Sequence, residues 1–217
     1  YFTNNNIMNI VNDDASPNDI ESNEAFFGKS CAAHSDPNTR ICTACAISGC
    51  AGSGKTFLAI EKVRRLAAEG LRVLYICYNK GAAGDAARAL EGVEGAESLT
   101  FHSLCTKFAE KASVPHKGPR ENPEILEEEF FSSILPNALM EATDRISDRY
   151  DAIVADEAQD FKGEWWQALQ MTLVDPDESI LYVFYDDNQV IYGEAPELPV
   201  KEEPFLLAEN LRNTKEI

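Results

Sequence analysis

The chain has 217 residues, of which 44% are hydrophobic and 26% are charged, a balance typical of a globular domain with its own core. Its formal net charge of −18 excludes a nucleic-acid binder that works through overall positive charge. It has no apolar run of the roughly 18 residues that span a membrane, and its first residues lack the basic start and apolar core of a signal peptide. We therefore expect a cytoplasmic protein that binds no membrane, with free thiols at its six cysteines.

Residues 1–40 are polar, with no sustained hydrophobic period, and this pattern predicts an N-terminal extension. From residue 41 to residue 217, apolar runs of strand length alternate with amphipathic stretches of helix length, which predicts one α/β domain with a mostly parallel sheet. Residues 41–120 carry 11 basic and seven acidic side chains, so an anion is expected to bind in this part of the domain. The expected strands are 42–48, 72–77, 97–101, 152–155, 180–185 and 205–207, and the expected helices are 56–69, 82–90, 102–112, 123–141 and 163–173.

A glycine-rich segment joins the first expected strand to the first expected helix, and it fits the pattern G-x-x-x-x-G-K-[ST]. In this pattern the glycines let backbone N–H groups approach phosphate oxygens, and the helix N-terminus adds its positive end. The spacing places Lys55 on the β- and γ-phosphates of a nucleotide and the Thr56 hydroxyl on Mg²⁺. The residues expected to bind nucleotide are Gly49, Cys50, Ala51, Gly52, Ser53, Gly54, Lys55 and Thr56.

Two adjacent acids follow the expected strand 152–155. Because the carboxyl ends of parallel strands meet at one edge of a sheet, these acids are expected beside the phosphate loop. We predict that Asp156 holds the Mg²⁺ shell and that Glu157 polarises the attacking water as the general base.

Besides the phosphate loop, five segments follow in chain order: Cys-Tyr-Asn-Lys-Gly-Ala-Ala at 77–83, Thr-Phe-His-Ser-Leu at 100–104, Asp-Glu-Ala-Gln-Asp at 156–160, Asp-Asp-Asn-Gln-Val-Ile-Tyr-Gly at 186–193 and Leu-Ala-Glu-Asn-Leu-Arg-Asn-Thr at 207–214. Together the six segments resemble those of the UvrD/Rep/PcrA-type superfamily 1 DNA helicases. The most specific of them is the Asp-Glu-x-Gln-Asp box, which says far more than a bare Asp-Glu pair. The resemblance implies a P-loop NTPase (RecA-like) three-layer fold, and specifically the first RecA-like ATPase domain of such a helicase.

The resemblance also implies a substrate, partners and residue roles. ATP is the substrate, Gln189 couples the γ-phosphate to the DNA-facing surface, and Arg212 acts as an arginine finger. The implied partners are single-stranded DNA and a second RecA-like domain in cis. Because the chain carries no motif of that second domain, we expect a fragment that hydrolyses ATP slowly and unwinds nothing by itself. The residues expected at single-stranded DNA are Tyr78, Asn79, Lys80, Phe101 and His102.

The sequence departs from that family at three places. The glutamine that reads adenine upstream of the phosphate loop is missing, and Asn23 is the candidate replacement. Only 53 residues separate His102 from Asp156, too few for the family's inserted DNA-binding subdomain, which favours the compact members related to nuclease-related-domain helicases. Glu194 stands where the family often has a base-stacking aromatic residue and an arginine, and this weakens the expected grip on DNA.

Two other functions stay open on the sequence. One is a P-loop ATPase switch that regulates a protein partner without unwinding DNA, and the other is a docking module that only binds nucleotide or a partner. The complete set of Lys55, Thr56, Asp156 and Glu157 argues against the docking module, because docking alone needs no catalytic base.

Two further patterns are interpreted as structural. The cysteines and histidine at positions 31, 34, 42 and 45 have zinc-like spacing, yet residues 42 and 45 are three apart near one strand, where their side chains point to opposite faces. Trp165 and Trp166 are adjacent on an expected helix and do not share a face. We therefore expect one indole to pack inward and the other to cover a surface.

Overall fold

The computed structural model describes residues 44–186, 198–200 and 203–207, and the predicted domain boundary after residue 40 lies outside these ranges. The described residues all belong to the unit Thr43–Ile217. Each strand begins and ends within two residues of its predicted range. The strands are β1 (Ala44–Gly49), β2 (Val73–Cys77), β3 (Ala96–Thr100), β4 (Ala152–Ala155), β5 (Ile180–Tyr185) and β6 (Phe205–Leu207).

These strands form one sheet in the order β3-β2-β4-β5-β1-β6, and every neighbouring pair is parallel. This confirms the predicted α/β fold of the P-loop NTPase type. β2 and β4 are buried along their whole length, as expected for a parallel sheet covered on both faces. Because the strands run in one direction, the segments that follow β4, β5 and β1 emerge side by side at one edge, and those that follow β2 and β3 emerge farther along it.

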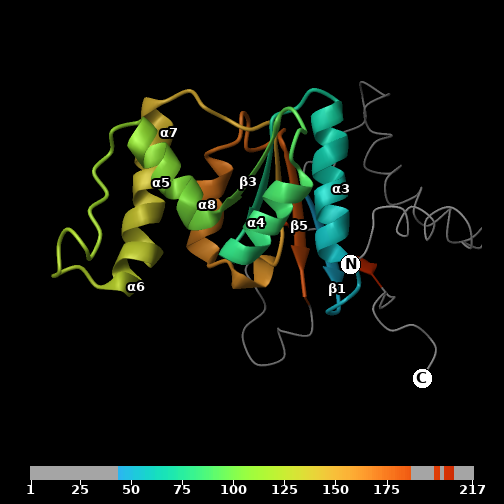
Figure 1. Cartoon of the computed structure of the whole chain (residues 1–217), viewed down its shortest axis with the longest axis horizontal. Helices are drawn as coiled ribbons and strands as arrows, with labels where there is room; N and C mark the ends of the chain where they lie inside the picture. Colours follow the sequence, from blue (N-terminus) through green and yellow to red (C-terminus); the bar gives the residue numbers. More distant parts are fainter. Residues whose placement is uncertain (1–43, 187–197, 201–202, 208–217) are drawn as a thin grey trace, which may run out of the picture. The chain divides into compact units, whose positions relative to one another are not determined.

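Helices cover both faces of the sheet (Figure 1). On one face lie α3 (Lys55–Ala68) and α4 (Lys80–Ala89), and on the other lie α5 (Phe101–Lys111), α7 (Leu135–Arg145) and α8 (Gly163–Gln170). Right-handed crossovers produce this division, since the chain moves in one direction along the sheet from β1 to β3 and in the other from β3 to β5. The result is the predicted three-layer architecture.

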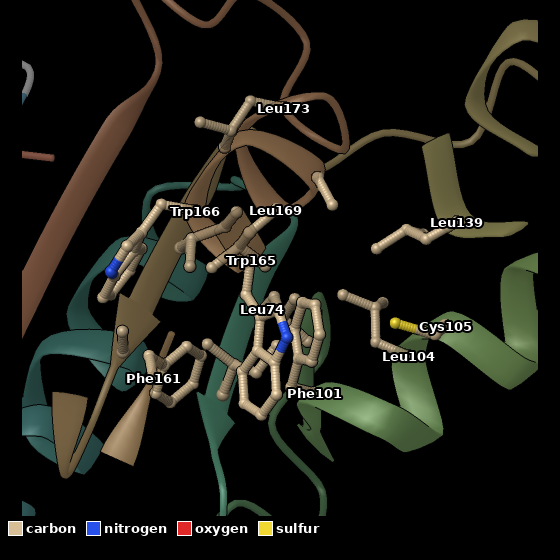
Figure 2. Close-up of a cluster of buried hydrophobic side chains, with 14 of the residues drawn as sticks. Leu74, Phe101, Leu104, Cys105, Leu139, Phe161, Trp165, Trp166, Leu169 and Leu173 are labelled. Atoms are coloured by element: carbon tan, nitrogen blue, oxygen red, sulfur yellow. The ribbon is translucent and has the colours of Figure 1, made fainter. Parts of the chain in front are cut away.

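A cluster of buried hydrophobic side chains lies between the sheet and α5, α7 and α8 (Figure 2). Leu74 of β2, Leu104 of α5, Leu139 of α7 and Leu169 of α8 are fully buried there. Because side chains alternate along a strand, Tyr75 points to the opposite face of the sheet from Leu74. Burial on both faces fixes the register of β2 and, with it, the position of every residue that follows.

The helix expected at 123–141 begins and ends four residues later and is interrupted. It comprises the short α6 (Glu127–Glu129), a π-helical turn η2 (Phe130–Ile134) and α7. Pro136 follows the π turn and has no N–H to donate, so the α-helical hydrogen-bond ladder cannot run unbroken through this point. No helix within residues 44–186 has the length and apolar character needed to cross a bilayer.

The two adjacent tryptophans are both buried, with 2% and 3% of their surface exposed, so the expectation that one of them covers a surface is wrong. Trp165 stacks on Phe101 with 4.6 Å between ring centroids, and Trp166 stacks on Phe161 with 5.0 Å (Figure 2). The segment before α8, which includes the 3₁₀ turn η3 (Ala158–Asp160), places Phe161 over the helix face that was expected to meet solvent.

Candidate active site

The phosphate loop is a tight turn between β1 and α3. Gly52 and Gly54 have φ values of 86° and 90°, a backbone region that residues other than glycine rarely adopt. A Cβ atom on Gly49 would lie 2.6 Å from Ser53 Oγ and 2.9 Å from Leu207 Cβ, so a larger residue does not fit there. Gly54 is the N-cap of α3 and offers no side chain to cap it, which leaves the first N–H groups of the helix to an anion.

The Lys55 ammonium lies inside this loop. It donates to the Gly49 carbonyl oxygen at 2.7 Å and to the Cys50 carbonyl oxygen at 3.1 Å, and it is 3.6 Å from Asp186 Oδ2. Lys55 and Asp186 are 6% and 3% exposed. The Ser53 hydroxyl is buried without a hydrogen-bond partner in the described part of the chain. A buried lysine, an unsatisfied hydroxyl and an uncapped helix N-terminus together fit the oxygens of a phosphate chain.

Asp156, directly after β4, is fully buried and held by hydrogen bonds. Its Oδ2 accepts from Tyr75 OH at 2.7 Å, its Oδ1 accepts from Glu157 N at 3.0 Å, and its carboxylate also accepts from the Thr56 hydroxyl. Burial raises the pKa of Asp156, whereas the hydrogen bonds from Tyr75 and Thr56 act in the opposite direction. The two side chains predicted to hold Mg²⁺ are thus in contact, and a hydroxyl plus a carboxylate fits an ion that takes few protein oxygens beside water and phosphate.

Tyr75→Phe is expected to lower the free energy of unfolding by about 1.5–3 kcal/mol, because it leaves a buried carboxylate with one donor fewer. Urea unfolding measures this change. Tyr78→Phe is the matched control: the Tyr78 side chain is 46% exposed, and its replacement is expected to change stability by no more than about 0.5 kcal/mol. Equal effects of the two substitutions would show that the Tyr75 hydroxyl contributes nothing to the site.

Glu157, the predicted general base, has a left-handed backbone conformation. Its φ is 51°, and such a conformation costs a residue other than glycine about 1–3 kcal/mol and is concentrated at active sites. Gln159 Nε2 donates to Glu157 Oε2 at 2.6 Å, and Gln159 Oε1 accepts from the Asp186 N–H at 3.2 Å. Gln159 therefore links the carboxylate of Glu157 to the end of β5.

Sequence reasoning did not assign Gln159, Asp186 and Tyr75 to the site. Gln159 and Asp186 follow the ends of β4 and β5. Because ligands bind at the carboxyl ends of parallel strands, this position in the sequence could have identified both as site residues. Tyr75 gave no such signal, because it lies within a strand and reaches Asp156 only through the pairing of β2 with β4.

Farther along the same edge of the sheet, a groove of about 710 Å³ opens at the carboxyl ends of β2 and β3. One of the five residues expected at single-stranded DNA, Phe101, does not line this groove, because its side chain is fully buried and stacks on Trp165. The structure corrects that assignment, since a fully buried ring has no surface to offer a ligand. Four of the five residues expected at single-stranded DNA line the groove: Tyr78, Asn79, Lys80 and His102.

Several residues singled out in the sequence lie outside the described ranges, so their roles stay predictions. For the nucleotide and DNA predictions these residues are Asn23, Gln189, Glu194 and Arg212. Positions 31, 34 and 42 of the zinc-like pattern also lie outside the described ranges.

In a comparison with known protein families, residues 38–195 match a family model described as an AAA domain (AAA_19). A search of curated proteins found no match to the chain. The matched range contains the phosphate loop, the Asp156–Glu157 pair and the groove residues, and it covers most of the chain. The chain therefore belongs to this AAA domain family, and its fold and family are those of an ATPase domain of the helicase-like motor type.

Proposed function

We propose that the chain is the ATP-binding and ATP-hydrolysing motor domain of a UvrD/Rep-like superfamily 1 DNA helicase-type protein that acts on single-stranded DNA. The observation that carries this proposal is the position of two candidate sites on one sheet edge. The phosphate loop and the Asp156–Glu157 pair follow β1 and β4, and the groove with Tyr78 and Lys80 follows β2, which pairs with β4. The buried strand β2, whose Tyr75 donates to Asp156, therefore connects the nucleotide site to the groove.

In this proposal the chain's own residues bind and orient the nucleotide. The N–H groups of the loop and of the first turn of α3 bind phosphate oxygens, and the Lys55 ammonium moves from the loop carbonyls to the β- and γ-phosphates. Thr56 and Asp156 would hold Mg²⁺, which would supply positive charge to stabilise the phosphates of the nucleotide. Ser53 gains the hydrogen-bond partner that it lacks among the described residues.

Glu157 acts in hydrolysis by orienting the attacking water and accepting its proton. Its backbone conformation and the hydrogen bond from Gln159 hold the carboxylate in one orientation, which lowers the entropy lost on reaching the transition state. Gln189, Arg212 and a second RecA-like domain in cis are further parts of this proposal; they rest on the resemblance of the segments 186–193 and 207–214.

A P-loop ATPase switch that acts on a protein partner is the second candidate function. The observation in its favour is the net charge of −18, which opposes the electrostatic attraction that holds DNA.

ATP turnover by the complete gene product, measured with and without single-stranded DNA, separates the two functions. A DNA motor is expected to hydrolyse ATP faster when an oligonucleotide is added, and blunt duplex DNA of equal concentration serves as the control. Turnover that is measurable but unaffected by single-stranded DNA would contradict the motor and favour the switch. Absence of turnover in the presence of Mg²⁺ and DNA would contradict both.

A further inference from the structure

The segment between α5 and α7 contributes an aromatic wall to the groove. The π turn η2 places Phe130 and Phe131 along it, and Leu135 continues the wall at the start of α7. Phe130 is partly buried, and a Cβ atom on Gly118 would lie 3.0 Å from its ring, so Gly118 and Phe130 pack closely. Phe131 is 41% exposed although it is a large apolar side chain. In this segment Phe130 is therefore packed against Gly118, whereas the Phe131 ring is exposed at the groove.

His102 holds Phe131 in this position. The His102 ring lies 4.9 Å from the Phe131 ring between centroids, and His102 Nε2 lies 3.2 Å from the Phe131 carbonyl oxygen, to which it donates as the Nε2–H tautomer. The same imidazole meets Tyr78 at 5.8 Å and Trp165 at 5.0 Å between centroids. Burial lowers the pKa of His102, which favours the neutral ring at neutral pH. His102 is thus a fixed, uncharged support between the exposed rings of Tyr78 and Phe131.

The groove offers one exposed lysine and two helix N-termini to a phosphate backbone. Lys80 is exposed and stands at the start of α4, and it lines the groove together with Thr100, the N-cap of α5, so the positive ends of two helices lie at the groove. Lys107 also lines the groove, although it pairs with Glu97, and Glu110 brings one negative charge. Exposed aromatic rings beside a cation and helix N-termini are the combination that binds single-stranded nucleic acid by stacking its bases and holding its phosphates.

We propose that Phe131 is a base-stacking residue, which together with Tyr78 receives an unstacked base of single-stranded DNA in this groove. The inference rests on the proposed action on single-stranded DNA and adds a contact from the segment between α5 and α7, which none of the segments quoted above includes. The groove volume of about 710 Å³ lies within the roughly 300–1,000 Å³ of ligand sites.

The test is a fluorescence-anisotropy titration of the chain with a labelled oligothymidylate and with an abasic strand of equal length. Phe131→Ala is expected to weaken binding of the oligothymidylate about 5- to 150-fold and to leave binding of the abasic strand unchanged, because only the base is stacked. Phe131→Trp is expected to retain the affinity. Phe205→Ala is the matched control, since Phe205 is also 41% exposed but lies on β6, at the opposite end of the strand order from β2 and β3. Unchanged ATP binding verifies that each variant is folded.

The outcomes separate this inference from the proposed function. If Lys80→Ala weakens binding of both strands while Phe131→Ala behaves like Phe205→Ala, the DNA site stands and the role of Phe131 is overturned. If Phe131→Ala weakens the two strands equally, base stacking is overturned. If the wild-type chain binds neither strand, the inference falls together with the proposed action on DNA.

Discussion

Lys55→Ala is expected to weaken binding of ATP in the presence of Mg²⁺ by about 10- to 150-fold, the effect of losing a hydrogen-bonded charge from the phosphates. The Lys55 ammonium is 6% exposed and lies within the loop, so water replaces it poorly. Anisotropy of a fluorescent ATP analogue measures the change. Lys117→Ala is the control, because Lys117 is exposed and lies outside the phosphate loop. Equal affinities of wild type and Lys55→Ala would contradict the assignment of the loop.

Loss of Lys55 also removes the cation beside the buried Asp186 carboxylate, so Lys55→Ala is expected to destabilise the fold as well. A second variant separates folding from binding. Combining Lys55→Ala with Asp186→Asn also removes the negative charge of the buried carboxylate and is expected to restore stability, while ATP affinity stays low. Recovery of both stability and affinity in the double variant would mean that Lys55 acts on the fold and not on the phosphates.

Glu157→Gln is expected to lower ATP turnover by about 10²- to 10⁴-fold while leaving ATP binding nearly unchanged. The substitution keeps the size of the side chain and an oxygen that accepts from Gln159 Nε2, but it removes the group that takes the proton of water. Phosphate release by the complete gene product measures turnover. Glu164→Gln, an exposed change of the same chemistry on α8, is expected to have no effect. Undiminished phosphate release by Glu157→Gln would show that another group is the base.

The fold could be predicted in detail because apolar runs of strand length are separated by amphipathic stretches of helix length between residues 41 and 185. Two expectations from the hydrophobic pattern were wrong, one for the helix at 123–141 and one for the two tryptophans. The helix around residues 123–141 is displaced because turns occupy the residues before 127 and because Pro136 disrupts the hydrogen-bond ladder. The expectation for Trp165 and Trp166 failed because a neighbouring segment, and not the helix itself, buries the second indole.

The phosphate loop and the Asp156–Glu157 pair could be recognised because their spacing within the chain is itself the chemical requirement. The remaining contacts depend on pairing between distant segments. Tyr75 is 81 residues from Asp156 in the chain, and it reaches that carboxylate because Ile76 pairs with Ala155. Phe131 is 29 residues from His102, and only the path between α5 and α7 brings the two together.

Calorimetric titration of the wild-type chain with ATP and with adenosine, each with Mg²⁺ and with a chelator, tests most directly whether these residues form a nucleotide site. The account predicts saturable binding of one ATP per chain in the presence of Mg²⁺, weaker binding when Mg²⁺ is removed from Thr56 and Asp156, and far weaker binding of adenosine, which has no phosphates for the loop. Adenosine binding as tight as that of ATP, or the absence of ATP binding with Mg²⁺ present, would contradict it.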